Sequence, residues 1–198
     1  MIESPYAGLS EQDWESKTKE LIHEHPIDID ELVEIVNSSW SSIFASAIGT
    51  QKLMLGKDIV LSPQFTGSIL GTLISHEFSS RHPKLWRPEE AKHDKDLVYL
   101  PDDCFSCEIK TSSSASRIYG NRSYAQPQSG DARKSKDGYY IGVNFDKMVE
   151  GESDKNIRRI WFGWLDHTDW NAQSSPTGQN ASLPAAIYGT KLVEIYRV

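Results

Sequence analysis

The chain has 198 residues, of which 38% are hydrophobic and 25% charged, the composition of a soluble globular protein with enough apolar material for a core. No segment approaches the roughly 18 consecutive apolar residues of a membrane helix. The first residues lack the basic and apolar regions of a secretory signal, so a cytoplasmic protein is expected. The formal net charge of −7 argues against a protein that holds nucleic acid by bulk positive charge, although positive charge can still be local.

The beginning of the chain predicts helices. Residues 10–24 start with a capping serine, continue with acidic residues in the first turn, and place apolar residues at helical spacing. Pro26 ends this pattern. A second helix is expected from a cap at Asp28 or Asp30 through Ile35.

Three further elements precede the most informative part of the sequence. A third helix is expected at 38–48 and a short strand at 57–62. Residues 66–78 place large apolar side chains at helical spacing, which predicts a mostly buried helix. The following segment, 79–95, is polar and contains two prolines, so it is read as irregular.

Two segments between residues 96 and 110 predict a β-hairpin. Residues 96–100 and 104–110 are expected to be strands, and 101–103 a tight turn. If Leu100 pairs with Cys104, Asp96 faces Glu108. Because side chains alternate along a strand, Asp96, Glu108 and Lys110 share one face. The opposite face is apolar and can pack into a core, with Leu97, Tyr99, Phe105, Cys107 and Ile109.

Facing carboxylates destabilise a sheet, because like charges repel, but they suit metal chemistry. Asp96 and Glu108 offer the hard oxygen ligands that Mg²⁺ prefers, and the backbone carbonyl of Ile109 is an additional candidate ligand. Lys110 could stabilise charge that develops at phosphorus, or position and deprotonate an attacking water. The pattern therefore favours metal-dependent phosphodiester hydrolysis.

The alternative is a sheet face that merely carries exposed charges. The tripeptide acid-x-Lys is unspecific, since it also occurs at 15–17 and 90–92. Asp94 competes with Asp96 as the first carboxylate, because it shares the strand face if the strand extends that far. Glu77 is a candidate for an accessory catalytic or metal role, because an acid on a buried helix is costly without a partner; its alternative is a surface acid near a helix end.

The two cysteines, Cys104 and Cys107, have the C-x-x-C spacing of redox pairs and zinc sites. Positions three apart on a strand point to opposite faces, which disfavours a local disulfide, and no second such pair exists. Both are therefore expected to be ordinary strand residues, with Cys107 buried.

The remainder of the chain alternates long polar segments with strands. Residues 111–137 are read as a long irregular segment of the kind that is usually functional. Strands are expected at 139–145, 159–165 and 191–197, and another polar segment at 166–182. The tryptophans at 161 and 164 are assigned to the core or to a subunit contact. Helices followed by a central set of strands predict one α/β or α+β domain.

The segment Glu108-Ile-Lys-Thr-Ser-Ser, followed by Ile118-Tyr-Gly-Asn-Arg-Ser-Tyr-Ala-Gln126, resembles the PD-(D/E)XK restriction endonucleases, and among them most the ScaI-type group of type II enzymes. Asp96, Glu108 and Lys110 occupy the three signature positions. Lys95 stands where the name-giving proline would be, which keeps Asp94 open as the first carboxylate. The resemblance in motif spans residues 77–145.

This resemblance implies a restriction-endonuclease-like core with a central mixed sheet flanked by helices. We expect a single domain over 1–198, which the resemblance makes an endonuclease domain, with a helical N-terminal part at 1–50 and a catalytic core at 66–165. The resemblance also implies a Mg²⁺-dependent homodimer that cuts double-stranded DNA at a short palindromic site and works with a cognate DNA methyltransferase.

The long polar segment fits DNA binding. From residue 117 to 136 it carries five basic residues against a single aspartate, a local charge of +4 in a chain of net −7. Arginine pairs well with guanine in the major groove, and asparagine or glutamine with adenine. The alternative is a solvated loop without contacts. The candidate DNA-binding residues are Arg117, Tyr119, Asn121, Arg122, Ser123, Tyr124, Gln126, Arg133, Lys134 and Lys136, with Asn171 and Gln173 from a second polar segment.

The leading hypothesis is thus a type II restriction endonuclease. One alternative is another nuclease of the same fold, of the repair or junction-resolving type, although those need a broader basic face than this acidic chain offers. The other alternative is a DNA-binding domain that has lost catalysis, which the intact set of Asp96, Glu108 and Lys110 disfavours.

Overall fold

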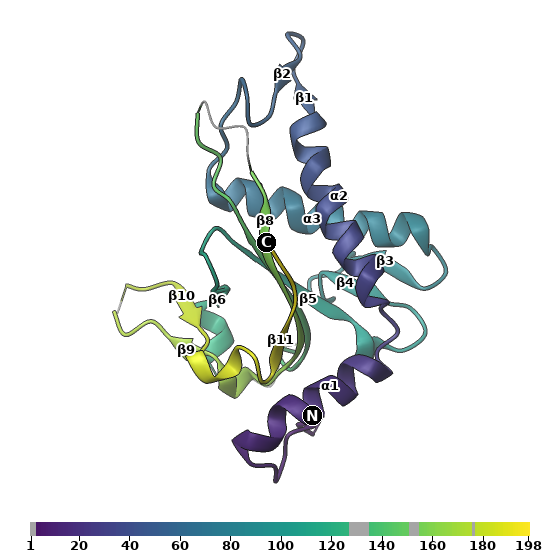
Figure 1. Cartoon of the computed structure of the whole chain (residues 1–198), viewed down its shortest axis with the longest axis vertical. Coiled ribbons are helices and arrows are strands. Elements are labelled where there is room, and N and C mark those ends of the chain that lie inside the picture. The colour runs from purple at the N-terminus through teal and green to yellow at the C-terminus, as the bar shows by residue number, and fades with distance from the viewer. Residues whose placement is uncertain (1–2, 127–134, 151–154, 176) are drawn as a thin grey trace.

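A six-stranded mixed sheet forms the centre of the molecule in the computed structural model, which describes residues 3–126, 135–150, 155–175 and 177–198 (Figure 1). Its two middle strands, β5 and β7, run parallel, and all other neighbouring strands are antiparallel. The predicted fold class, a mixed sheet with flanking helices, is therefore confirmed. In spatial order the strands are β11 (Leu192–Arg197), β8 (Ile157–Leu165), β7 (Gly138–Phe145), β5 (Cys107–Ser112), β4 (Leu97–Tyr99) and β3 (Trp86–Pro88).

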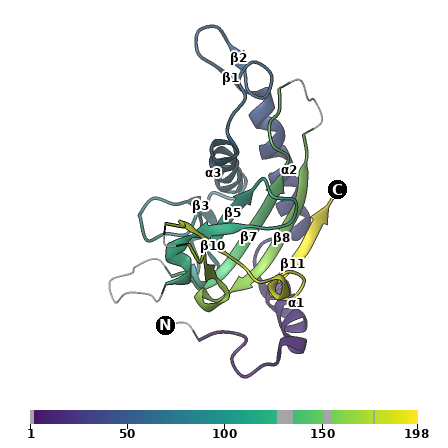
Figure 2. The same ribbon diagram turned by 90° about the vertical axis from the view of Figure 1, so that its left-hand side faces the viewer.

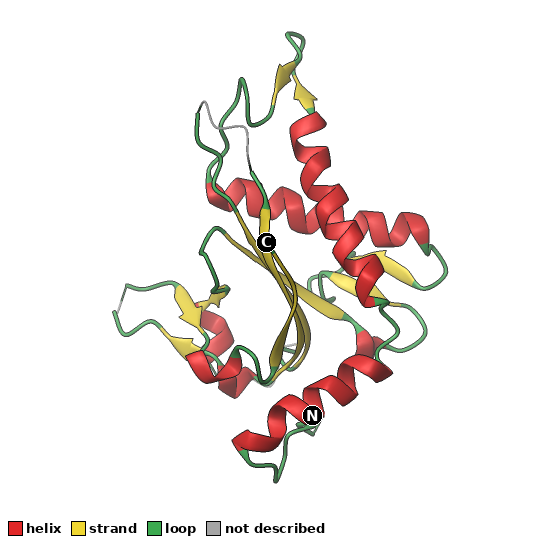
Figure 3. Cartoon of the chain, in the orientation of Figure 1, coloured by secondary structure: helices red, strands yellow, loops and turns green. Residues whose placement is uncertain are grey.

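Three helices, α1 (Trp14–Glu24), α2 (Ile29–Ala45) and α3 (Pro63–Arg81), pack on one face of this sheet (Figure 3). Alternate residues of β5, β7 and β8 point toward them and form the larger core, because side chains alternate across a strand. Residues buried there include Leu32, Ile35, Leu70, Ile74, Phe78, Cys107, Ile109, Ile141, Phe162 and Trp164. None of the helices in the described part of the chain combines the length and hydropathy of a membrane span.

The predicted break in the second helix is wrong. Asp28 caps α2 by accepting a hydrogen bond from the backbone N–H of Glu31 at 2.9 Å, and the helix continues to Ala45 because its apolar residues keep facing the core. After Ala45 the chain enters a short hairpin of β1 (Ala47–Ile48) and β2 (Leu53–Met54).

The strand expected at 57–62 does not form. Met54 O accepts from the backbone N–H groups of Asp58 and Ile59, so the chain turns back here and leaves only an isolated bridge between Leu55 and Ile59. The buried helix expected at 66–78 is confirmed as α3. It begins earlier because Ser62 caps it and Pro63 occupies its first turn.

The second face of the sheet is covered by the two polar segments that the sequence analysis treated separately. They meet in a three-stranded antiparallel sheet of β6 (Tyr119–Asn121), β10 (Asn180–Ser182) and β9 (Asn171–Ala172), hereafter the small sheet (Figure 2). A second core, including Ile118, Tyr140, Trp161, Trp170 and Leu192, lies between the small sheet and the central sheet. Trp161 and Trp164 therefore belong to the cores on opposite faces.

His25, at the end of α1, is buried between the helices and the hairpin. Its Nδ1 accepts from the backbone N–H of Ile27 at 3.1 Å, and its Nε2 lies 2.9 Å from the carbonyl oxygen of Phe105. These contacts suit the neutral ring with its proton on Nε2. Burial lowers the pKa of His25 to about 4.

We expect this histidine to make the fold sensitive to mild acid. Unfolded His25 binds a proton near its ordinary pKa of about 6.5, whereas folded His25 does so only near 4, so the unfolded state binds more protons between these values. The free energy of unfolding should therefore fall by about 2 kcal/mol between pH 7 and about pH 4.5 on account of this group. Urea unfolding at both pH values checks it, and an equal pH dependence in His25→Gln would contradict it.

Candidate active site

The hairpin has the register that the sequence analysis predicted. Leu97 pairs with Cys107, which sets Asp96 across from Glu108. The connecting loop is longer than the expected tight turn, since a 3₁₀ turn occupies Asp103–Phe105 and β5 begins only at Cys107. The Asp102 side chain stabilises this turn by accepting from the backbone N–H of Cys104 at 3.0 Å. Cys107 is a buried free thiol and Cys104 an exposed one.

Glu108 and Lys110 form a buried ion pair on the small-sheet side of β5. The Lys110 Nζ lies 2.6 Å from Glu108 Oε1, and the Glu108 residue is 2% exposed. Tyr124 completes this group: its hydroxyl donates a short hydrogen bond to Glu108 Oε1 and accepts one from Lys110 Nζ at 2.9 Å. An acid and a base held this far from water interact strongly, because the local dielectric is low.

Asp96 directly precedes β4, beside the part of β5 that follows the pair of Leu97 with Cys107. Its Oδ2 accepts from the backbone N–H of Ile109 at 2.7 Å. The N–H and C=O of one strand residue point to the same edge, so the Ile109 carbonyl also lies on the Asp96 side of β5.

The surroundings of Tyr124 favour the protonated form of its hydroxyl. Burial raises the pKa of the Tyr124 hydroxyl, the Glu108 carboxylate raises it further, and Asp96 and Glu89 add to the effect. The hydroxyl is therefore neutral at physiological pH and remains a proton donor to Glu108.

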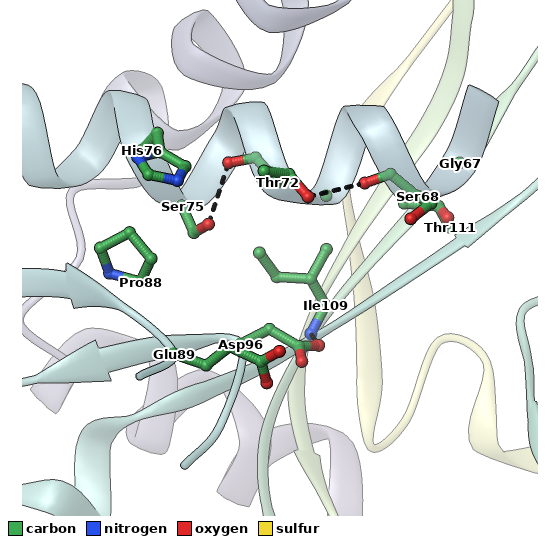
Figure 4. Close-up of a pocket in the computed structure, with 11 residues that line it drawn as sticks. Gly67, Ser68, Thr72, Ser75, His76, Pro88, Glu89, Asp96, Ile109 and Thr111 are labelled. Carbon is green, nitrogen blue, oxygen red and sulfur yellow. Dashed lines mark hydrogen bonds between the residues drawn. The ribbon is translucent and has the colours of Figure 1, made fainter. Parts of the chain in front are cut away.

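A cavity of about 430 Å³ opens beside Asp96, between α3 and β5. Figure 4 shows Asp96 and Ile109 on the sheet side of this cavity and the polar face of α3 opposite them. The described residues that line it are Gly67, Ser68, Gly71, Thr72, Ser75, His76, Pro88, Glu89, Asp96, Ile109 and Thr111.

The donor set fits a hard divalent cation. Asp96 and Glu108 stand opposite each other in the register that Leu97 and Cys107 set, and a backbone carbonyl lies on the edge of β5 beside Asp96. In the described part of the chain, no cluster of three or more His, Cys, Asp or Glu side chains is arranged to hold a metal. A cation here would therefore depend on the backbone carbonyl and on water as well as on carboxylates, as Mg²⁺ commonly does.

The structure separates Asp94 from Asp96. The Asp94 Oδ2 pairs with Arg87 Nη1 at 2.7 Å and accepts from the backbone N–H groups of Glu90 and Ala91 at 3.0 Å each. Arg87 and these N–H groups hold the pKa of the Asp94 carboxyl well below its usual range. The partners of Asp94 therefore give it a structural role, whereas the Asp96 side chain lines the cavity.

Glu77 is not brought to the site. Its Oε1 pairs with Arg81 Nε at 2.9 Å on α3, and Arg81 also pairs with Glu34 of α2 at 3.0 Å. The Glu77 side chain is 38% exposed and is not among the described residues that line the cavity. The structure thus supports the alternative of a surface acid near a helix end.

Apart from Tyr124, the predicted DNA-binding residues fall into three groups. Arg133 and Lys134 lie outside the described residues. Arg122 and Lys136 bind backbone carbonyls: Arg122 Nη1 donates to Ser175 O and Gly178 O at 3.0 Å each, and Lys136 Nζ donates to Ser123 O and Gln126 O. The remaining set is exposed on or beside the small sheet, namely Arg117, Tyr119, Asn121, Ser123, Gln126, Asn171 and Gln173.

The sequence predicts a DNA contact for Tyr124, whereas the structure places its hydroxyl against Glu108 and Lys110. No local signal marks it, because the contact joins residues 14 and 16 positions apart through a turn of the chain. The polar face of α3 was also missed, although its signal is present: Ser68, Thr72 and Ser75 recur at helical spacing opposite the apolar stripe.

Comparisons with known proteins identify the family of the chain. A family model described as ScaI restriction endonuclease matches residues 4–196. A protein from Streptomyces caespitosus named "Type II restriction enzyme ScaI" is 44% identical over 195 residues, which is 98% of this chain and 85% of that protein. No solved structure matches.

Proposed function

The chain belongs to the ScaI restriction endonuclease family, and on that premise we propose that this site-specific DNA endonuclease cuts the backbone of double-stranded DNA with Asp96, Glu108 and Lys110. One observation carries the assignment: the hairpin register sets Asp96 across from Glu108, while Lys110 shares a buried ion pair with Glu108. Two acids on facing strand positions destabilise a sheet, so their presence here favours a catalytic role over a structural one.

Asp96, Glu108 and the carbonyl of Ile109 would hold the divalent cation, and we propose Mg²⁺ in this role. When bound, a divalent cation supplies Lewis-acid chemistry by neutralising negative charge on the scissile phosphate. The carboxylates would fix its place, because Asp96 is anchored on the β5 backbone and Glu108 is held by Lys110 and Tyr124.

Lys110 acts on the reacting phosphate. In hydrolysis a water oxygen bonds to phosphorus, the bond from phosphorus to one backbone oxygen breaks, and a proton from water reaches the departing oxygen. The Lys110 ammonium can stabilise the charge that develops on phosphate or hold the attacking water, since it points from β5 on the same face as Glu108.

The small sheet and its loops provide the DNA-recognition surface in this proposal. Their exposed amides and basic side chains suit base edges and phosphates, which are read by different groups. The long segment of 111–137 and the segment of 166–182 act together, because β10 pairs with both β6 and β9.

We further propose that the whole chain acts as one endonuclease domain and cuts as a homodimer. A palindromic site has two-fold symmetry, so two identical subunits place one active site on each strand. A cognate DNA methyltransferase in the same system would protect the host sites. Sedimentation with and without a duplex that carries the site measures the assembly, and a monomer on cleaved DNA would contradict the dimer.

Incubation with a long plasmid and Mg²⁺ tests the function directly. Discrete bands are the expected result, and chelation of the metal should abolish them until Mg²⁺ is restored. A smear would instead indicate a nonspecific nuclease, and intact DNA a binding domain without catalysis.

Replacing Arg122 should weaken DNA recognition. In Arg122→Ala the loop around Ser175 and Gly178 loses two hydrogen bonds from a charged donor, so the small sheet is less well ordered for DNA. We expect affinity for site-containing DNA to fall at least about tenfold, the scale of one hydrogen bond from a charged donor. Arg197→Ala is the control, since Arg197 lies on edge strand β11 with its side chain 61% exposed. Unchanged affinity and cutting pattern in Arg122→Ala would remove this loop from the interface.

A further inference from the structure

Tyr124 connects the small sheet to the active site. It lies in a 3₁₀ turn, η3 (Arg122–Ala125), that directly follows β6. Its ring packs 5.4 Å from that of Trp170 and 6.5 Å from that of Tyr140, measured between centroids. A Cβ added at Gly120 would lie 3.1 Å from Tyr124 Cγ and 3.2 Å from Trp170 Cζ3, so glycine permits this close packing.

The turn that carries Tyr124 is tied to both polar segments. The backbone N–H of Arg122 donates to Gln179 O at 2.6 Å, and Lys136 Nζ donates to Gln126 O at 3.1 Å. The backbone of this turn is therefore held by the surface that we assign to DNA, while the Tyr124 ring also packs on Tyr140 of β7.

The end of the side chain contacts both of these active-site groups. The hydroxyl donates to Glu108 Oε1 and accepts from Lys110 Nζ, and the same Nζ lies 4.5 Å from the centroid of the ring. Three groups of this kind hold one another in a single arrangement, because each hydrogen bond has an ionised partner.

We propose that Tyr124 is a positioning residue, which orients Glu108 and Lys110 for cleavage and makes their arrangement depend on the small sheet. This rests on the proposed function of Glu108 and Lys110. Tyr124 acts through them, so its effect belongs to the cleavage step and not to DNA affinity.

Tyr124→Phe tests the proposal, since it removes the hydroxyl and keeps the packed ring. We expect the single-turnover cleavage rate to fall about 10- to 100-fold, the range for loss of a hydrogen bond to a charged group. Affinity for the same DNA, measured without metal, should change less than about twofold, and the melting temperature should stay near that of the wild type. Tyr139→Phe is the matched control: it removes a buried hydroxyl that donates to Leu21 O at 3.4 Å on the opposite face of the central sheet.

Gly120→Ala tests the link to the small sheet. The added methyl group requires the Tyr124 ring or Trp170 to give by a few tenths of an ångström, which should slow cleavage while the hydroxyl is still present. If the methyl group acts through the hydroxyl, the double variant Gly120→Ala/Tyr124→Phe should cleave no more slowly than Tyr124→Phe. Independent, multiplicative losses would overturn the link.

Lys110→Ala, measured in parallel, distinguishes failure of the role proposed for Tyr124 from failure of the active-site assignment. Wild-type cleavage in Tyr124→Phe together with an inactive Lys110→Ala would overturn the role of Tyr124 and leave the active site in place. Equal losses of DNA affinity and of cleavage rate in Tyr124→Phe would assign a structural role instead and also overturn it. Cleavage by Lys110→Ala at the wild-type rate would remove the active-site assignment, and the proposal for Tyr124 with it.

Discussion

Glu108→Ala and Lys110→Ala are each expected to abolish cleavage of site-containing DNA, with a loss of at least about 10³-fold in rate. Glu108→Ala removes a carboxylate that would hold the cation, and Lys110→Ala removes the positive charge beside the scissile phosphate. Either change also leaves a buried partner of the 2.6 Å ion pair uncompensated. Single-turnover cleavage of a short duplex measures the loss, and circular dichroism shows whether the protein is folded.

The conservative variant Glu108→Gln distinguishes a loss of catalysis from a loss of folding. It keeps the shape of the side chain and an acceptor for the Tyr124 hydroxyl while it removes the charge. It should therefore stay folded and inactive. Full activity in any of these three variants would refute the site assignment.

The chain contains its own matched control for the pattern acid-x-Lys. Glu15 and Lys17 repeat the spacing of Glu108 and Lys110, but they lie on α1 and pair with Lys19 and Glu20 at the surface. The double variant Glu15→Ala/Lys17→Ala should cleave like the wild type, since exposed pairs contribute little. A comparable loss there would mean that the assay reports stability and not chemistry.

Asp96→Asn and Asp94→Asn are expected to have opposite consequences. Asp96→Asn keeps an oxygen for the backbone N–H of Ile109 but loses the charge that favours a cation, so cleavage should fall at least about 10³-fold with the fold intact. Asp94→Asn should remain active but lose about 1–3 kcal/mol of stability, because the Arg87 guanidinium loses its ionised partner.

Cleavage assays and urea unfolding of both variants decide between the two acids. Below the ordinary pKa of aspartate the stability from Asp94 should also decline in the wild type, since its folded pKa is depressed and protonation breaks the ion pair. An inactive, fully stable Asp94→Asn beside an active Asp96→Asn would reverse the assignment of the first carboxylate.

Elements whose pattern depends on neighbours in sequence were well predicted. The apolar spacing of α3, the strand at 139–145 and the hairpin register at Leu97 and Cys107 all follow from local rules, since helical period and strand alternation are properties of adjacent residues. The short strand β3 was not predicted, because its three residues are extended only through their pairing with β4.

The sequence by itself determined which residue types stand on each face of β5, and with them the chemistry of two acids and a lysine. Only the tertiary structure decided that Asp94 forms an ion pair with Arg87, that Glu77 forms one with Arg81, and that the Tyr124 hydroxyl bonds to Glu108. The reason is physical: alternation along a strand is encoded every two residues, whereas these partners depend on where separate segments pack against one another.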